Sequence, residues 1–404
     1  MTPHPPITRG ELAALVGGSS PTTLAPVGGR SRRCTVQHQG VTIRCGAPGT
    51  TPLPGEGNAT GRLEVDLCGL DRLVEHRPEE LVATVECGIS LSGLQRALAA
   101  HGQCLPIAPP CSGLAEGSSS TLGGTLAANA CGLERLRFGT ARDWVIGATL
   151  LRGDGSFARA GAPVVKNVSG YDLTKLYLGA WGSLGVLVEV HLKLTPIPPV
   201  RTCVVVDRST TPDMDFNRIR ATAASLSGAC LVDHEGTSRL YLLLAGVETA
   251  VARDLERSGA RTFDPGDPLG SPGALDAIRA GTDTHLSLRI GTDPAQATRL
   301  RSALDHQLGR ETPERVVSLL GTGISWLGWT RPVEPSQCSG LVQRVRSLAR
   351  DLGGFATVER APMEAEILSW WGTRGHAARL TRAIKLALDP ENRFPPPPVD
   401  DDGD

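Results

Sequence analysis

The feature that most constrains the fold is a glycine-punctuated tract that runs straight into a strand. Residues 166–185 read KNVSGYDLTKLYLGAWGSLG, and the last three glycines are spaced three residues apart. Residues 186–194 then alternate apolar and polar side chains, which is typical of a β-strand with one buried and one solvated face. Glycines at this spacing allow a close backbone approach to a flat ligand. We therefore predict a ligand-binding loop that leads into a sheet, with glycines serving only tight turns as the alternative.

Two earlier tracts combine paired glycines with hydrogen-bond donors. Residues 24–31 read LAPVGGRS, and residues 118–129 read SSSTLGGTLAAN. Consecutive glycine amides can converge on an anion such as a phosphate, and neighbouring hydroxyl groups add further donors. The alternatives are an ordinary surface turn for the first tract and a glycine hinge before a small-residue helix for the second.

Periodicity predicts an α+β chain. Strands are expected at 81–87, 144–152 and 186–194, a hairpin at 153–160, and a helix over 90–100 with Ser90 as its N-cap. Strands and helices alternate again after the prolines at 196–199, with helices at 213–226, 248–257, 340–351 and 379–388 and strands at 202–206, 239–244, 285–290, 321–328 and 355–360. We predict a first domain over residues 1–200, a second with an antiparallel sheet over 201–390, and a disordered Pro/Asp tail over 391–404.

Composition narrows the function. The 41 Lys and Arg residues balance 42 Asp and Glu residues, so no basic face for nucleic acid is expected. None of the ten cysteines forms a C-x-x-C pair, and no Walker loop, no helix-opening G-x-G-x-x-G and no His-x-x-x-His motif occurs, so no metal site is predicted. The start of the chain lacks a signal-peptide pattern, and its apolar stretches are short or broken by glycine. We expect a cytoplasmic protein that meets a membrane only through a complex.

The three tracts, in this order, resemble the FAD-binding domain of the vanillyl-alcohol oxidase / p-cresol methylhydroxylase superfamily (PCMH type) over about residues 20–200. The stretches GGFATVERAPMEAEILSWWGT (353–373) and RAIKLALDPENRF (382–394) resemble the C-terminal end of the E-type, FAD-binding subunits of bacterial glycolate oxidases. The resemblance implies a two-subdomain PCMH-type FAD-binding domain, followed by an α+β cap domain with an antiparallel sheet.

The resemblance also implies which residues hold FAD. Those expected to contact the pyrophosphate, the adenosine or the flavin are Pro26, Gly28, Gly29, Arg30, Ser31, Thr121, Gly123, Gly124, Asn129, Gly139, Gly170, Gly182, Gly185 and Val186. In the first loop, Val27 and Arg30 stand where the family commonly has glycine or another small residue.

The activity implied is oxidation of a small 2-hydroxy acid, with glycolate favoured, and transfer of the electrons to a partner. The expected complex contains a second flavoprotein subunit and an iron–sulfur subunit. The chain lacks the family's His-x-Gly-Asp-Gly-Asn segment. His285, Glu359 and Arg360, in the strands expected for the cap, are candidates for a catalytic base, but no catalytic role is assigned to them. The alternatives are a scaffold subunit that binds FAD weakly or not at all, and a self-sufficient flavin oxidase of another alcohol.

Overall fold

The computed structural model describes residues 9, 23–26, 35–38, 41–44, 62–65, 67, 69–107, 120–164, 172–207, 216–234, 236–258, 261–262, 284–362, 371–372, 376–397 and 399. The chain packs as two compact units. Unit 1 comprises residues 1–131, 140–197 and 374–399, and unit 2 comprises 132–139, 198–373 and 400–404. Unit 1 therefore takes in residues from both ends of the chain, including part of the segment expected to be a tail.

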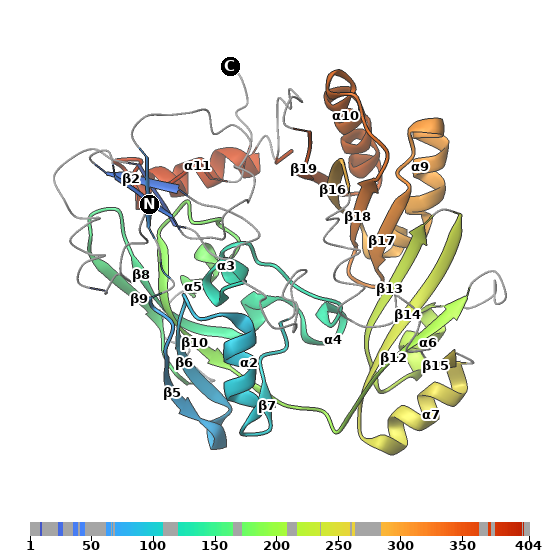
Figure 1. The fold of residues 1–404 in the computed structure, drawn as a ribbon, viewed down its shortest axis with the longest axis horizontal. Helices are drawn as coiled ribbons and strands as arrows, with labels where there is room; N and C mark the ends of the chain where they lie inside the picture. Colours follow the sequence, from blue (N-terminus) through green and yellow to red (C-terminus); the bar gives the residue numbers. More distant parts are fainter. Residues whose placement is uncertain are drawn as a thin grey trace. The chain divides into compact units, whose positions relative to one another are not determined.

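Unit 1 is built on an antiparallel five-stranded sheet in the order β5-β6-β10-β8-β9 (Figure 1). Its strands are β5 (Leu73–Arg77), β6 (Val82–Glu86), β10 (Val186–Lys193), β8 (Val145–Leu151) and β9 (Phe157–Gly161). Three smaller pairings are parallel β1 (Thr23–Pro26) with β4 (Arg62–Val65), β2 (Thr35–His38) with β3 (Val41–Arg44), and β7 (Gln103–Cys104) with β11 (Thr195–Pro196). The strands expected at 81–87, 144–152 and 186–194 are confirmed.

The helices of unit 1 are α2 (Leu91–Ala99), α3 (Leu122–Ala127), α5 (Thr174–Tyr177) and α11 (His376–Leu388), with 3-10 turns η1 (Pro78–Glu80) and η2 (Ala141–Asp143). The predicted N-cap is confirmed, because the Ser90 hydroxyl accepts a hydrogen bond from Gly93 N at 3.1 Å. Leucines 91, 94 and 98 of α2 join the core that also contains Val85 and Val190 of the sheet. The apolar spacing of α2 thus fixes which of its faces packs on the sheet.

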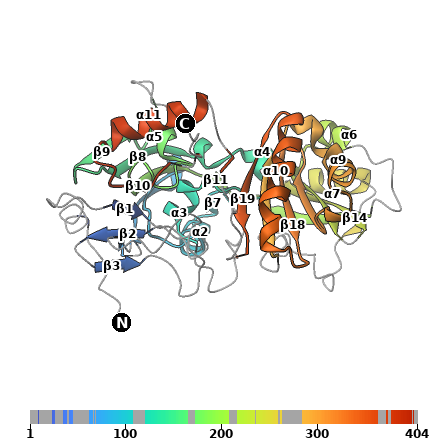
Figure 2. The same ribbon diagram turned by 90° about the horizontal axis from the view of Figure 1, so that it is seen from above.

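Unit 2 contains an eight-stranded sheet, and every strand pair in it is antiparallel. Its order is β15-β12-β14-β13-β17-β18-β16-β19, which confirms the expected antiparallel cap sheet (Figure 1). Figure 2 shows β14, β18 and β19 of this sheet from above. The strands are β12 (Val200–Asp207), β13 (Leu226–His234), β14 (Thr237–Gly246), β15 (Arg261–Thr262), β16 (Leu286–Gly291), β17 (Arg315–Leu319), β18 (Ile324–Trp329) and β19 (Phe355–Arg360).

Helices pack against one face of the unit 2 sheet. They are α6 (Phe216–Thr222), α7 (Glu248–Ser258), α9 (Leu300–Leu308) and α10 (Pro335–Asp351), and the unit also contains α4 (Arg135–Phe138), η3 (Pro294–Arg299) and η4 (Gly309–Glu311). Apolar residues of α9 and α10 share one buried cluster with Leu288 and Leu327, and those of α6 and α7 share another with Leu231 and Leu242. Alternation along each strand sends these residues to the helix-covered face.

The helix expected over 213–226 is shorter in the structure. Helix α6 ends at Thr222, and β13 begins at Leu226. The amide and the hydroxyl of Ser225 both donate to the buried carboxylate of Asp254 at 2.8 Å, so the chain turns there instead of continuing the helix. Such a long-range capping bond has no signal in the local sequence. None of the helices that the structure describes is both long and apolar enough to cross a membrane.

Candidate functional site

The second glycine tract forms the start of α3 and is held by its own hydroxyl groups. Thr121 is the N-cap, and its Oγ1 accepts a hydrogen bond from Gly124 N at 3.2 Å. The Thr125 hydroxyl donates back to the Thr121 carbonyl at 2.9 Å. The Thr-Leu-Gly-Gly-Thr pattern therefore begins a short helix by ordinary capping.

The same tract docks on the segment that joins β6 to α2. Gly123 N donates to the Cys87 carbonyl at 2.7 Å, and Leu122 N donates to the Ile89 carbonyl at 2.9 Å. A Cβ atom at position 123 would lie 2.9 Å from both Cβ and O of Cys87, which is closer than such atoms approach. Glycine at 123 is thus required for the contact of α3 with this segment. Both amides of the Gly123–Gly124 pair donate to protein acceptors.

The third tract forms a loop with an unusual backbone. Gly179, Trp181 and Gly182 have φ values of +85°, +55° and +74°, in the left-handed region, and Gly185 has a φ of +152°. Only glycine enters this region freely, so the spacing of the glycines follows from the path of the loop. Trp181 is bulky and pays a conformational penalty there, which the surrounding contacts must offset.

The structure joins the second and third tracts. Gly179 N donates to the Leu126 carbonyl at 3.1 Å, and Trp181 N donates to the Ala127 carbonyl at 2.9 Å. These carbonyls belong to the last turn of α3, where carbonyl groups lack a full set of amides from within the helix, and the Leu126 carbonyl also accepts from Asn129 N at 3.0 Å. A Cβ atom at Gly179 would lie 3.2 Å from Cβ of Asn129. The second and third tracts, which lie about fifty residues apart in sequence, are therefore joined by backbone hydrogen bonds next to Asn129. We call this joined pair of segments the wall.

Asn129 supplies a polar atom without a partner in this wall. The residue has a φ of +45°, and its Oδ1 atom is buried and accepts no hydrogen bond among the described residues. A buried amide oxygen left unpaired costs about 1–3 kcal/mol. FAD carries donors in its sugar hydroxyls and ring N–H groups, so this orphaned acceptor fits such a cofactor.

The remaining predicted residues fall in three places. Val186 is the first residue of β10, is buried, and pairs with Leu151. Gly139 follows α4 with a φ of +74° and belongs to unit 2, apart from the other predicted residues that the structure describes. Pro26 lies in β1 beside Val65, where only the backbone is described. Gly28, Gly29, Arg30, Ser31 and Gly170 lie outside the described residues.

Lys175, the second of the two lysines of the third tract, binds protein groups. Its Nζ donates to the carbonyls of Arg142 and Val145, the latter at 2.8 Å, and it forms an ion pair with Asp172 at 3.5 Å. The lysine thus ties α5 to the start of β8.

Glu359 of β19, to which sequence analysis assigned no catalytic role, has a structural partner in unit 2. Its Oε1 lies 3.7 Å from Nε of Arg289 on the neighbouring strand β16. No group of three or more ligating side chains suited to a metal occurs within the described ranges.

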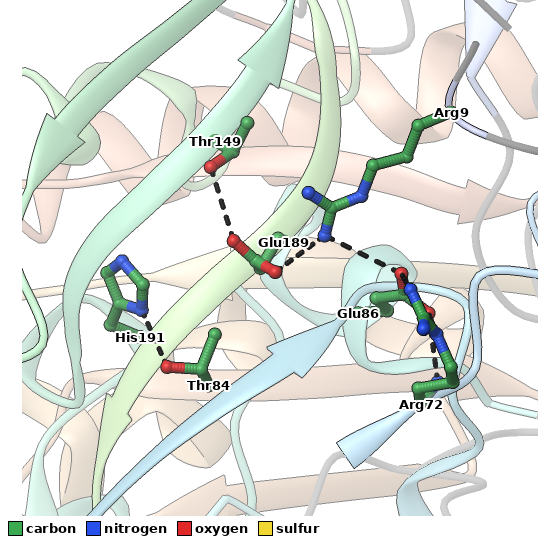
Figure 3. Close-up of polar contacts among 7 residues, drawn as sticks. All are labelled: Arg9, Arg72, Thr84, Glu86, Thr149, Glu189 and His191. Atoms are coloured by element: carbon green, nitrogen blue, oxygen red, sulfur yellow. Dashed lines mark hydrogen bonds and ion pairs between the residues drawn. The ribbon is translucent and has the colours of Figure 1, made fainter. Parts of the chain in front are cut away.

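Sequence analysis missed a charged cluster on β6 and β10, shown in Figure 3. Glu86 and Glu189 are directly opposite each other on these strands, and Arg9 lies between them, 2.5 Å from Glu189 and 3.5 Å from Glu86. Arg72 also contacts Glu86, at 2.9 Å through Nη2 and 3.1 Å through Nε. The alternation along 186–194 predicts that Glu189 lies on a solvated face, which is wrong in part, because its side chain is only 13% exposed.

Electrostatics explain how two glutamates tolerate this position. Burial raises the pKa of Glu86, but the hydrogen bonds and charge of Arg72, together with the charge of Arg9, outweigh it and lower the pKa overall. Nearby, burial lowers the pKa of His191, whose Nδ1 lies 3.0 Å from the Thr84 hydroxyl. The cluster links β6 to β10. Strand β6 leads into Cys87, on which α3 docks.

The two joined glycine tracts and the unpaired Asn129 oxygen lie in a unit that mixes helices with an antiparallel sheet. The family model described as an FAD binding domain matches residues 21–161. Residues 21–161 thus match a PCMH-type FAD-binding domain.

Proteins that are similar to this chain carry the names of oxidases and dehydrogenases. Glycolate oxidase subunit GlcE of Escherichia coli (strain K12) is 35% identical over 188 residues, which is 45% of this chain and 51% of that protein. Glycolate oxidase subunit GlcD of Bacillus subtilis (strain 168) is 35% identical over 132 residues, 33% of this chain and 27% of that protein. A D-2-hydroxyglutarate dehydrogenase of Xanthomonas citri pv. viticola is 34% identical over 262 residues, 63% of this chain and 54% of that protein.

These matches cover between about a quarter and about half of the relatives' own lengths. A solved structure of an alkyldihydroxyacetonephosphate synthase has the same fold, with a TM-score of 0.58 at 13% identity, over 87% of this chain and 72% of that one. That likeness extends the shared fold beyond the residues that the family model matches.

Proposed function

We propose that this chain is the FAD-carrying, E-type subunit of a glycolate-oxidising complex. The observation that carries the proposal is the wall formed by the two joined glycine tracts around Asn129, in a chain 35% identical to a glycolate oxidase subunit over 188 residues. When bound, FAD supplies the acceptor for the hydride from the α-carbon of the hydroxy acid.

The residues of the chain bind and orient this cofactor. Gly182 and Gly185 keep the loop backbone free of side chains, and Asn129 Oδ1 accepts a hydrogen bond from the cofactor. Because both amides of the Gly123–Gly124 pair already donate within the protein, the pyrophosphate takes its donors chiefly from the 24–31 loop.

Electrons leave the cofactor for another subunit. The sequence has no C-x-x-C pair, so an iron–sulfur centre in the complex belongs to a partner chain, and a second flavoprotein subunit completes the assembly. The chain also lacks the His-x-Gly-Asp-Gly-Asn segment of full-length hydroxy-acid relatives. We place the complex in the cytoplasm, where any contact with a membrane is made through partners.

The test is the visible absorption spectrum of the purified full chain, reconstituted with FAD, before and after glycolate is added without oxygen. The proposal predicts a two-band flavin spectrum that bleaches when glycolate is added with the partner subunits present. A spectrum that bleaches only with a different alcohol supports a flavin oxidase of another substrate. A flavin that never bleaches contradicts the proposed reaction.

A second candidate function is that of a scaffold subunit that binds FAD weakly or not at all. The engagement of the Gly123 and Gly124 amides within the protein favours it, because it removes two donors expected for the pyrophosphate. The altered first loop, with Val27 and Arg30, supports it as well. In the same experiment, a chain that takes up no flavin from excess FAD supports the scaffold and overturns the first proposal.

A further inference from the structure

Helix α11 ends in a buried cluster within unit 1, which we call the knot and which consists of Lys385, Asp389 and Phe394. Lys385 and Asp389 of α11 and its C-terminal end are 6% and 2% exposed, and Phe394 is fully buried beside them. Figure 1 shows α11, in red at the C-terminal end of the chain, in the same unit as the five-stranded sheet. A lone buried ammonium is strongly unfavourable, so its partners decide whether the knot is stable.

Every polar atom of this pair is used. Lys385 Nζ donates to the carboxylate of Asp389, to the Phe394 carbonyl at 2.9 Å and to the Ser183 carbonyl at 2.9 Å. These three bonds use all the donors of an ammonium group. Asp389 in turn accepts hydrogen bonds from the amides of Arg393 and Phe394 at 2.9 and 2.8 Å.

The turn between β8 and β9 fits against the knot as well. A Cβ atom at Gly153 would lie 2.8 Å from Oδ1 of Asp389 and 3.6 Å from the Phe394 ring. Any larger residue at 153 would push the carboxylate away. The knot is therefore packed on three sides: by the turn, by the residues that follow α11, and by the loop that contains Ser183.

That loop is the third glycine tract, and its backbone needs external anchors. It contains Trp181 in the left-handed region and is held at its start by the α3 carbonyls. Ser183 lies between Gly182 and Gly185, and its amide and hydroxyl both donate to the Ala180 carbonyl within the same loop. Lys385 is the side chain from outside the loop that bonds to the Ser183 carbonyl.

We propose that Lys385 is a positioning residue for the flavin: it fixes the Gly182–Gly185 backbone through the Ser183 carbonyl. The C-terminal helix, more than two hundred residues further along the chain, thereby sets the shape of the cofactor loop. This inference rests on the proposed function, since it assumes that the loop holds FAD.

The experiment compares FAD dissociation constants, measured by flavin fluorescence, for the full-length wild type, Lys385→Met and Leu388→Ala. Leu388 is on the same helix and packs on the unit 1 core, but it makes no bond to the loop, so it reports on the weakened docking of α11 alone. Unfolding temperatures of the apo-proteins are measured in parallel. We expect both variants to lose stability, whereas only Lys385→Met weakens FAD binding, by about tenfold or more, and alters the circular dichroism of the bound flavin.

The double variant Lys385→Met/Asp389→Asn guards against a failure to fold. It leaves no unpaired buried carboxylate, and the asparagine oxygen still accepts a backbone amide. It should fold and show the same loss of FAD affinity as the single variant. Wild-type affinity in this double variant, or an equal loss in Leu388→Ala, would overturn the inference. A wild type that binds no FAD would instead overturn the proposed function.

Discussion

Asn129 adopts a left-handed backbone conformation, which asparagine and glycine tolerate better than other residues. The backbone at position 129 suits both glycine and asparagine. Of these two residues only asparagine has a side-chain acceptor, the buried Oδ1 atom that has no partner among the described residues. Glu86 shows the opposite case. Its carboxylate is saturated by Arg72 and Arg9, so its charge is stable although the side chain is only 1% exposed. An unsatisfied polar atom marks a candidate ligand contact, and a saturated one marks structure.

Asn129→Gly separates these two roles. Glycine accepts the same backbone conformation and removes the unpaired oxygen, so the free energy of unfolding of the apo-protein should fall by no more than about 1 kcal/mol. FAD binding should weaken by roughly tenfold, as expected for one lost hydrogen bond of about 1–1.5 kcal/mol. Fluorescence titration measures the affinity. Asn392→Gly is the matched control, since Asn392 has a φ of +49° and is exposed. Equal FAD affinity in both variants would exclude Asn129 as a contact.

Glu86 predicts how unit 1 responds to acid. Because the pKa of Glu86 is lower in the folded than in the unfolded chain, its contribution to stability is complete above the unfolded pKa of about 4.5. It is lost as the pH falls through the folded value. In Glu86→Gln, the unfolding free energy should be lower at neutral pH and fall less steeply below about pH 5 than in the wild type. Urea unfolding at several pH values measures this slope. A variant at the exposed Glu79 should keep the wild-type slope, and a Glu86→Gln protein that does so too would contradict the account.

At the scale of elements, the site depends on how α3 docks. The helix has only six residues, so its place is set by contacts at both ends: Cys87 and Ile89 at the start, and the third tract at the end. The β6–α2 junction that receives it is close-packed in turn, since a Cβ atom at Gly88 would lie 1.9 Å from the Leu67 carbonyl oxygen. Gly88 and Gly123 thus allow segments of the protein to pack closely against each other, and a glycine in this region need not mark a ligand contact.

Gly123→Ala tests this docking. The added methyl would meet Cys87 at 2.9 Å, so α3 must shift, and we expect a loss of about 1–3 kcal/mol in the free energy of unfolding together with weaker FAD binding. Gly340→Ala, inside α10, has open space around it and should instead stabilise the chain by about 0.5–1 kcal/mol. Chemical denaturation compares the two. If Gly123→Ala is as stable as the wild type, the close contact with Cys87 does not hold α3.

These elements also show how far the sequence carries the argument. Alternation located β6 and β10, and the serine before an amphipathic run located the cap of α2, because those signals are local. Strands β13 and β17 escaped prediction, since strands that are buried on both faces lack a clear period. The partners of Lys175 in the third tract, two backbone carbonyls, were not predicted either. Its partners lie about thirty residues away, so no local pattern identifies them.

At the scale of the whole molecule, the chain forms two units, and its C-terminal helix belongs to the first. Local pattern predicted a boundary near residue 200 and a disordered tail after residue 390, whereas Phe394 is fully buried within unit 1. The knot at Lys385 depends on partners from residues 153, 183 and 394, so only the folded chain shows it. If Lys385 positions the loop as proposed, the C-terminal helix takes part in shaping the cofactor site.

The central claim is that the joined tracts of unit 1 hold FAD, and hydrogen–deuterium exchange of the full chain with and without FAD tests it most directly. The account predicts slower exchange in 122–130 and 178–186 when FAD is added, with the sheet of unit 2 as the internal reference. Binding of FAD with unchanged exchange in both segments would place the cofactor elsewhere and contradict the account.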